Sequence, residues 1–331
     1  MGGQAILQSL YYWIFSVGVK TLGGLSSPDR LDRLAAILGQ IRSRFGYIGS
    51  SKEDYLREFV RCLSPLGADQ KRELLRRFWV EHQRRFLDLF LLPSLTPQNL
   101  QRLVKIENRR ELDRLFQQGK GIILPVPHFG NVRLHHVALA LSGFPVSVVS
   151  GDYHMEPAFV QRTKLEHESK LHQVGFLKQG TAWMIEALRR GDLLQIASTA
   201  EASAQGVWVT MLKRRLFLPT GWLRLSRMTG APVLPTLIFH LPGGRYVIKI
   251  LDEFPLHWTG DREGDLQNNA QRLMDLFSPF YQSYPEQVDW MYWLVRVRES
   301  EGIARNQNLE LRDKLISPPE PGPDKPPPDV R

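Results

Sequence analysis

The sequence is poor in cysteine, since Cys62 is the only one among 331 residues. One cysteine cannot form a disulfide within the chain, so nothing indicates an oxidising compartment. It cannot form a cysteine-based zinc site either, and in its apolar, helical surroundings we interpret it as a small buried hydrophobe.

The N-terminus lacks the marks of a cleaved signal peptide, because it has neither a basic n-region nor an A-x-A-like cleavage site. No charged side chain precedes Lys20. The uncharged run approaches the ~17-residue lower limit of a membrane helix, and Tyr11, Tyr12 and Trp13 are types that prefer the headgroup level. We interpret residues 1–25 as a membrane anchor or interfacial helix; the alternative is a buried helix of a soluble protein.

The sequence also lacks any helix-turn-helix, zinc or RNA-recognition motif to accompany its net charge of +9. A basic balance suits an anionic membrane surface, an acidic carrier protein or a nucleic acid. Without a motif, nucleic-acid binding rests on charge alone, and no nucleic-acid partner is expected.

The pattern of apolar residues divides the rest of the chain into three parts. Residues 26–118 are helical in pattern, with apolar residues at spacings of three and four and Arg-rich polar faces. Residues 119–300 alternate strands and helices, which indicates an α/β domain. Residues 316–331 are Pro-rich and polar, and we expect them to be disordered.

Five strands are expected in the α/β domain, at residues 121–127, 146–150, 193–198, 233–241 and 245–251. The helices expected around them are 131–142, 156–172, 180–190, 219–229, 264–283 and 285–298. The dipeptide Gly243-Gly244 predicts a hairpin between the last two strands. The expected fold is therefore a mixed central sheet flanked by helices, preceded by the helical portion and the anchor.

His128 follows the first of these strands and opens the stretch HFGN. A histidine at the mouth of an α/β sheet can take the proton of an attacking hydroxyl, because its pKa lies near working pH. Asn131 and the free N–H groups of the next helix suit an anion or a developing oxyanion.

A basic block lies further along the chain. Lys213, Arg214 and Arg215 precede Thr220, which opens a helix bearing Arg224. Cations before a helix N-terminus suit a phosphate, whereas the alternative is a solvated turn. We predict that these five residues contact substrate.

These segments together resemble the bacterial lipid A biosynthesis acyltransferases and their mycobacterial phosphatidylinositol mannoside relatives. HFGN resembles the start of the family's His-x4-acid motif. The block from Gly206 resembles the family's strand, basic turn, Thr-Gly helix and Gly-Ala-Pro strand, and YPEQVDWMYW from Tyr284 resembles its closing segment. The resemblance covers about residues 5–298.

The resemblance implies a glycerolipid acyltransferase-like fold and a reaction. In the implied reaction, an acyl chain would move from acyl carrier protein or acyl-CoA to a hydroxyl of a lipid or glycolipid, at the cytoplasmic face of the inner membrane. No metal and no bound cofactor are implied. His128 would be the general base.

The sequence departs from the family pattern at two acids. The position five residues after His128 holds Arg133, which accepts no hydrogen bond and whose positive charge would depress the histidine's pKa. We predict that Arg133 holds a phosphate or carboxylate of the substrate. The second acid's position holds Thr199. Glu201 lies two residues later and would face the same side of an extended chain; we predict it as the orienting acid, with an exposed loop carboxylate as the alternative.

Two function hypotheses follow. The first is a membrane-associated O-acyltransferase with a rebuilt His128–Glu201 pair. The second is a non-catalytic relative that binds acyl carrier protein or lipid as an accessory subunit, which the two departures favour. A carboxylate within hydrogen-bond reach of the His128 ring would favour the enzyme.

Overall fold

The computed structural model describes residues 28–45, 59–63, 66–150, 170–199 and 205–306. The predicted anchor at 1–25, Glu201 and the predicted tail at 316–331 lie outside the described residues, as does nearly all of the helix predicted at 156–172.

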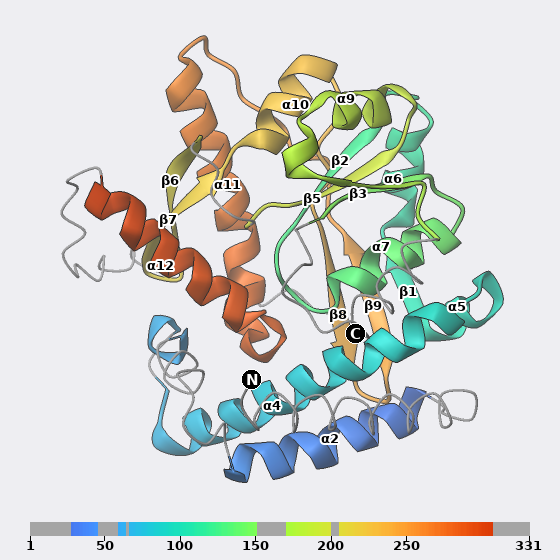
Figure 1. The fold of residues 1–331 in the computed structure, drawn as a ribbon, viewed down its shortest axis with the longest axis vertical. Helices are drawn as coiled ribbons and strands as arrows, with labels where there is room; N and C mark the ends of the chain where they lie inside the picture. Colours follow the sequence, from blue (N-terminus) through green and yellow to red (C-terminus); the bar gives the residue numbers. More distant parts are fainter. Residues whose placement is uncertain (1–27, 46–58, 64–65, 151–169, 200–204, 307–331) are drawn as a thin grey trace, which may run out of the picture.

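Helices surround three groups of strands (Figure 1). The α-helices are α2 (Pro28–Phe45), α4 (Ala68–Leu91), α5 (Pro97–Leu103), α6 (Arg109–Phe116), α7 (Val132–Leu141), α9 (Ala182–Arg189), α10 (Gly221–Thr229), α11 (Arg262–Ser283) and α12 (Trp290–Asn306). Short 3-10 helices are η1 (Leu92–Ser94), η2 (Leu177–Gln179) and η3 (Pro285–Gln287). The strands are β1 (Val104–Glu107), β2 (Ile122–Val126), β3 (Val146–Ser150), β4 (Gln173–Phe176), β5 (Leu193–Ala197), β6 (Gly206–Met211), β7 (Arg214–Pro219), β8 (Thr236–Leu241) and β9 (Arg245–Ile250).

The sheets are mixed in direction. Strands β2, β5, β3 and β4 pair in that order and are all parallel, whereas β8 is antiparallel to β9 and β1 is parallel to β9. A parallel bridge between Ile123 and Val233 joins the two sheets. Strands β6 and β7 form a separate hairpin. The α/β class, the mixed sheet and the Gly243-Gly244 hairpin are thereby confirmed, and both glycines adopt the positive φ that this turn requires.

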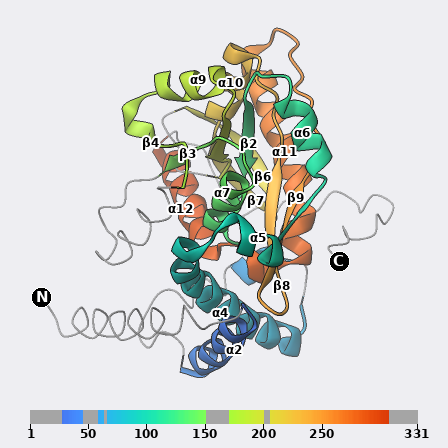
Figure 2. The ribbon, with the colours of Figure 1, turned by 90° about the vertical axis from the view of Figure 1, so that its right-hand side faces the viewer.

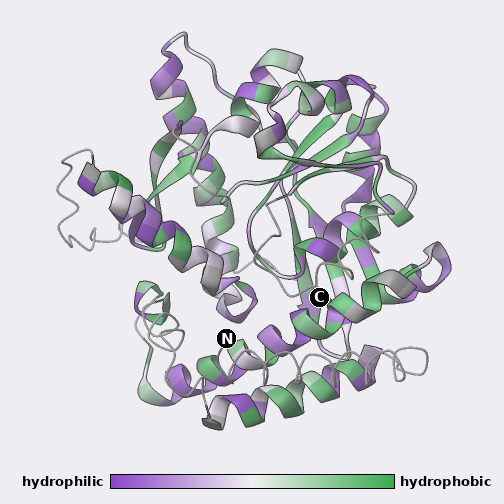
Figure 3. Ribbon diagram, in the orientation of Figure 1, coloured by the Kyte–Doolittle hydropathy of each residue, from purple (hydrophilic) through white to green (hydrophobic). Residues whose placement is uncertain are grey.

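The core lies on both faces of the sheet. On β2, Ile122 and Leu124 enter one hydrophobic cluster and Ile123 enters another. On β8, Ile238 joins the first cluster, and Leu237 and Phe239 join the second. Successive strand residues point to opposite faces, so this alternation requires helices on both sides. Figure 3 shows hydrophobic residues along the strands.

The helices α2 and α4 pack along each other at one end of the molecule (Figures 1 and 2). Within the described part of the predicted helical portion, Val104–Glu107 are not helical but form β1 and pair with β9. None of the described helices is long and apolar enough to cross a bilayer.

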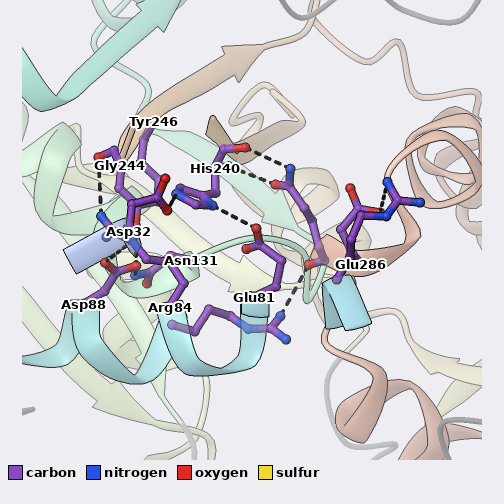
Figure 4. Close-up of polar contacts among 12 residues, drawn as sticks. Asp32, Glu81, Arg84, Asp88, Asn131, His240, Gly244, Tyr246 and Glu286 are labelled. Atoms are coloured by element: carbon purple, nitrogen blue, oxygen red, sulfur yellow. Dashed lines mark hydrogen bonds and ion pairs between the residues drawn. The ribbon is translucent and has the colours of Figure 1, made fainter. Parts of the chain in front are cut away.

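A buried polar network ties α4 to the β8–β9 hairpin (Figure 4). The Arg84 side chain is fully buried. Its Nε lies 3.1 Å from Asp88 Oδ1 and donates a hydrogen bond to the Tyr246 hydroxyl at 2.9 Å. The Tyr246 hydroxyl donates in turn to Asp88 Oδ2 at 2.5 Å. Because each buried charge has a partner, the network holds the helices against the sheet.

His240 extends this network to α2. Its Nδ1 lies 2.8 Å from Glu81 Oε1, and its Nε2 lies 3.1 Å from Asp32 Oδ1. Burial lowers the pKa of His240, but Glu81 and Asp32 outweigh that effect and raise it to about 10. His240 is therefore an imidazolium at neutral pH and bridges two carboxylates of different helices.

Candidate active site

His128 and Thr199 stand at the same edge of the parallel sheet. Each lies two residues beyond the end of its strand, β2 for His128 and β5 for Thr199, and these strands are paired in parallel. The carboxyl ends of neighbouring parallel strands meet at one edge, which is where α/β folds place their sites. The topology therefore brings two residues 71 positions apart into contact.

The Thr199 hydroxyl holds the His128 ring. Its Oγ1 lies 2.7 Å from His128 Nδ1 and also accepts the backbone N–H of His128 at 3.3 Å. When Nδ1–H donates to the same oxygen, the neutral ring carries its free lone pair on Nε2. In that tautomer Nε2 is free to act as a base, whereas a Thr199 hydroxyl that donates to Nδ1 would leave the proton on Nε2.

The surroundings of His128 keep the ring neutral. Burial lowers its pKa from 6.5 to about 4; Asp289 opposes this effect, and Arg296 and Arg133 add to it. The sequence predicted the depressing effect of Arg133, and it is confirmed. A half-buried ring that is neutral at pH 7 can accept a proton from a hydroxyl.

Asp289, just before α12, and Tyr292, in the first turn of α12, form a second wall of the site, which the sequence reasoning missed. The ring of Tyr292 stacks on His128 with centroids 4.1 Å apart and planes inclined by 9°. The backbone N–H of Asp289 donates to the His128 carbonyl oxygen at 2.9 Å. Both residues belong to YPEQVDWMYW, so the resemblance pointed to the segment without giving these two residues a role.

Asn131 has its side chain engaged within the protein. It caps α7, with Oδ1 accepting the Leu134 N–H at 3.0 Å, and its Nδ2 donates to Asp88 Oδ2 at 2.8 Å. The side chain therefore connects the histidine turn to the buried network of Figure 4. Its contact with substrate stays a prediction.

Arg133 lies in the first turn of α7 and is half-buried. Within the described part of the chain its guanidinium makes no hydrogen bond or ion pair, yet its charge acts on His128. Of the cationic residues predicted to bind substrate, Arg133 is therefore the one whose charge acts on His128.

The basic block is spread over the β6–β7 hairpin. Lys213 Nζ donates to the Leu63 carbonyl oxygen at 3.4 Å, and the Arg215 guanidinium lies over the Trp208 ring at 5.1 Å. Arg214 Nε lies 3.5 Å from Cys62 Sγ. The contacts of Lys213 and Arg214 connect the hairpin to residues 62–63, whereas the contact of Arg215 lies within the hairpin; none of them involves His128.

Thr220 and Arg224 belong to α10. Thr220 stands at the N-cap position with 1% exposure, and its hydroxyl has no hydrogen-bond partner among the described residues. The Arg224 guanidinium bonds to the Gln205 side chain. Their contact with substrate stays a prediction.

Glu201 lies outside the described residues, so its pairing with His128 stays a prediction. Among the residues that are described, the ring's hydrogen-bond partner is a hydroxyl and not a carboxylate. The same residues contain no group of three or more His, Cys, Asp or Glu side chains able to hold a metal ion.

Comparison with known proteins agrees with this arrangement. Residues 1–297 match the family described as bacterial lipid A biosynthesis acyltransferase. The chain is also 24% identical, over 253 residues, to the phosphatidylinositol mannoside acyltransferase of Mycolicibacterium smegmatis. That match covers 75% of this chain and 80% of the relative.

Proposed function

Because the chain belongs to the bacterial lipid A biosynthesis acyltransferase family and is an O-acyltransferase, we propose that it transfers an acyl chain from a thioester donor to a sugar hydroxyl of a membrane glycolipid. The donor is acyl carrier protein or acyl-CoA. The observation that carries the proposal is the 2.7 Å contact between His128 Nδ1 and Thr199 Oγ1. When Nδ1–H donates to this oxygen, Nε2 is the free base.

The reaction follows from that tautomer. His128 Nε2 takes the proton of the acceptor hydroxyl as its oxygen attacks the thioester carbonyl carbon. The tetrahedral intermediate then expels the thiolate, which takes the proton from the imidazolium. No redox cofactor or metal enters this balance.

The cationic side chains near the site bind the charged groups of the substrate. Arg133 is half-buried beside His128 and is suited to a phosphate of the donor or acceptor. The relative's name supports a glycolipid acceptor. We propose that the reaction occurs at the cytoplasmic face of the inner membrane, which the net charge of +9 supports through attraction to anionic lipids.

The test is an acyl-transfer assay on detergent-solubilised protein. Labelled acyl carrier protein and acyl-CoA are offered in parallel with a membrane lipid extract, and wild type is compared with His128→Ala. Transfer by the wild type and its loss in the variant support the proposal. Binding of donor or lipid without transfer would instead indicate an accessory subunit, which the neutral partner of His128 favours.

Membrane association has its own measurement. Sedimentation with vesicles of neutral lipid, or of neutral lipid containing an anionic phospholipid, measures binding directly. We expect binding to the anionic vesicles that weakens with salt. Equal absence of binding to both would contradict a membrane location.

A further inference from the structure

The residues just before α12 are bonded directly to the catalytic turn. The Gly130 N–H donates to the Gln287 carbonyl oxygen at 2.7 Å, and the Asp289 N–H donates to the His128 carbonyl oxygen at 2.9 Å. Between these bonds, Phe129 and Val288 form an antiparallel bridge. The backbone of residues 287–289 is therefore fixed relative to His128.

Asp289 of this segment and Tyr292 in the first turn of α12 both act on the His128 ring. Tyr292 stacks on its face, and because Tyr292 is itself 45% exposed, the stack lies at the mouth of the site. Asp289 is the negative charge that favours the protonated ring, whereas Arg296 on the same helix and Arg133 on α7 oppose it.

The Asp289 carboxylate is only weakly used for capping. Its Oδ1 accepts the Tyr292 N–H at 3.5 Å, which is long for a hydrogen bond. Its charge is therefore available to the neighbouring ring, and no other carboxylate among the described residues is a main influence on that ring.

We propose that Asp289 and Tyr292 are the positioning residues of His128. In the family's motif an acid has this role, and this chain has Arg133 at the position expected for that acid. Asp289 stabilises the imidazolium that forms when His128 accepts the proton of the acceptor hydroxyl. Tyr292 fixes the plane of the ring, and Thr199 fixes its rotation. This inference rests on the proposed function, in which His128 is the base.

The first experiment needs no substrate. Asp289→Asn removes the charge and keeps a good helix cap, and the His128 ring is titrated by NMR with labelled histidine, its signal assigned from its loss in His128→Ala. The expected result is a lower midpoint for His128 in Asp289→Asn and an unchanged midpoint in Asp289→Glu. The matched control is Asp261→Asn, which changes the cap of α11 and should leave the midpoint unchanged. An unchanged midpoint in Asp289→Asn, or the same fall in Asp289→Glu, overturns the proposal.

The second experiment measures transfer. Asp289→Asn is expected to lower kcat about tenfold with little change in KM, since an opposite charge shifts a pKa by one unit or more. Tyr292→Phe keeps the stacked ring and should keep the rate, whereas Tyr292→Leu should lower it. Equal rates in Asp289→Asn and wild type overturn the proposal. If the wild type transfers nothing, the proposed function fails, and the NMR titration still decides whether Asp289 acts on His128.

Discussion

At the scale of single residues, the proposed site depends on the hydroxyl of Thr199, at the position where the sequence analysis expected the family's second acid. Thr199 lies 5% exposed beside His128 and bonds both its ring and its backbone. A hydroxyl can set the tautomer of the ring, but it carries no charge to stabilise the imidazolium. In the proposed mechanism, His128 is the base, Thr199 orients its ring, and the charge that stabilises the imidazolium comes from another residue.

Replacing Thr199 tests whether its hydroxyl orients the His128 ring. Thr199→Val keeps the shape of the side chain and removes Oγ1, so His128 loses its Nδ1 partner. We expect transfer to fall by about tenfold or more, because a general base must hold both tautomer and position. Thr199→Ser keeps the oxygen and should retain most of the rate. Wild-type kcat in Thr199→Val would show that the contact is not used.

The pH dependence of transfer follows from the lowered pKa of His128. The ring must be neutral to act as a base, so kcat/KM should be flat between about pH 6 and 8 and should fall as pH drops towards about 4. The measurement is a profile taken over the range in which the protein stays folded. A fall that is centred on the ordinary histidine value of 6.5 would contradict the buried environment.

Part of this site could be predicted from sequence and part could not. His128 and the position of Thr199 follow from strand ends and motif spacing. The contact of Tyr292 with His128 joins residues 164 apart, and its geometry arises from the β-bridge between Phe129 and Val288. No local pattern encodes such a contact.

At the scale of elements, the helices were predictable because their apolar faces repeat at helical spacing. Helices α7, α9, α10 and α11 lie within a few residues of the expected ranges, as do strands β2, β3, β5 and β9. Strand β1 was missed because four residues, VKIE, carry little pattern, and pairing with β9 makes them a strand. The segment 285–298 holds η3, a break and then α12, rather than one helix.

The bridge made by His240 predicts a loss of stability at alkaline pH. The pKa of His240 is raised in the folded protein, so its contribution is fully present below about pH 6.5 and is lost as pH rises through about 10. Chemical denaturation at a series of pH values should show this decline in the wild type. His240→Gln should show a smaller decline across the same window. The control is His257→Gln, a histidine change outside the network, which should follow the wild type.

At the scale of the whole molecule, the helices α2 and α4 and the sheet form one connected structure. Strand β1 leads from the helical portion into the sheet, and Arg84 joins α4 to the β8–β9 hairpin through Tyr246 and the Gly244 carbonyl oxygen. The predicted boundary at residue 119 stays a prediction, but these contacts cross it.

A connected core predicts a single unfolding transition. Far-ultraviolet circular dichroism and tryptophan fluorescence should give coincident thermal curves. Arg84→Met leaves Asp88 buried without its cation and should cost about 3–5 kcal/mol of the free energy of unfolding. Two separate transitions in the wild type would show instead that the helical portion and the α/β domain unfold independently.

The pairing of residues 128–130 with 287–289 also has a consequence for biosynthesis. The histidine turn is translated long before residues 287–292, which form its second wall. A nascent chain that lacks this segment has His128 without the Tyr292 stack and without Asp289. The proposed catalytic centre is therefore completed only when residues 287–292 have been translated, after the strands that carry His128 and Thr199.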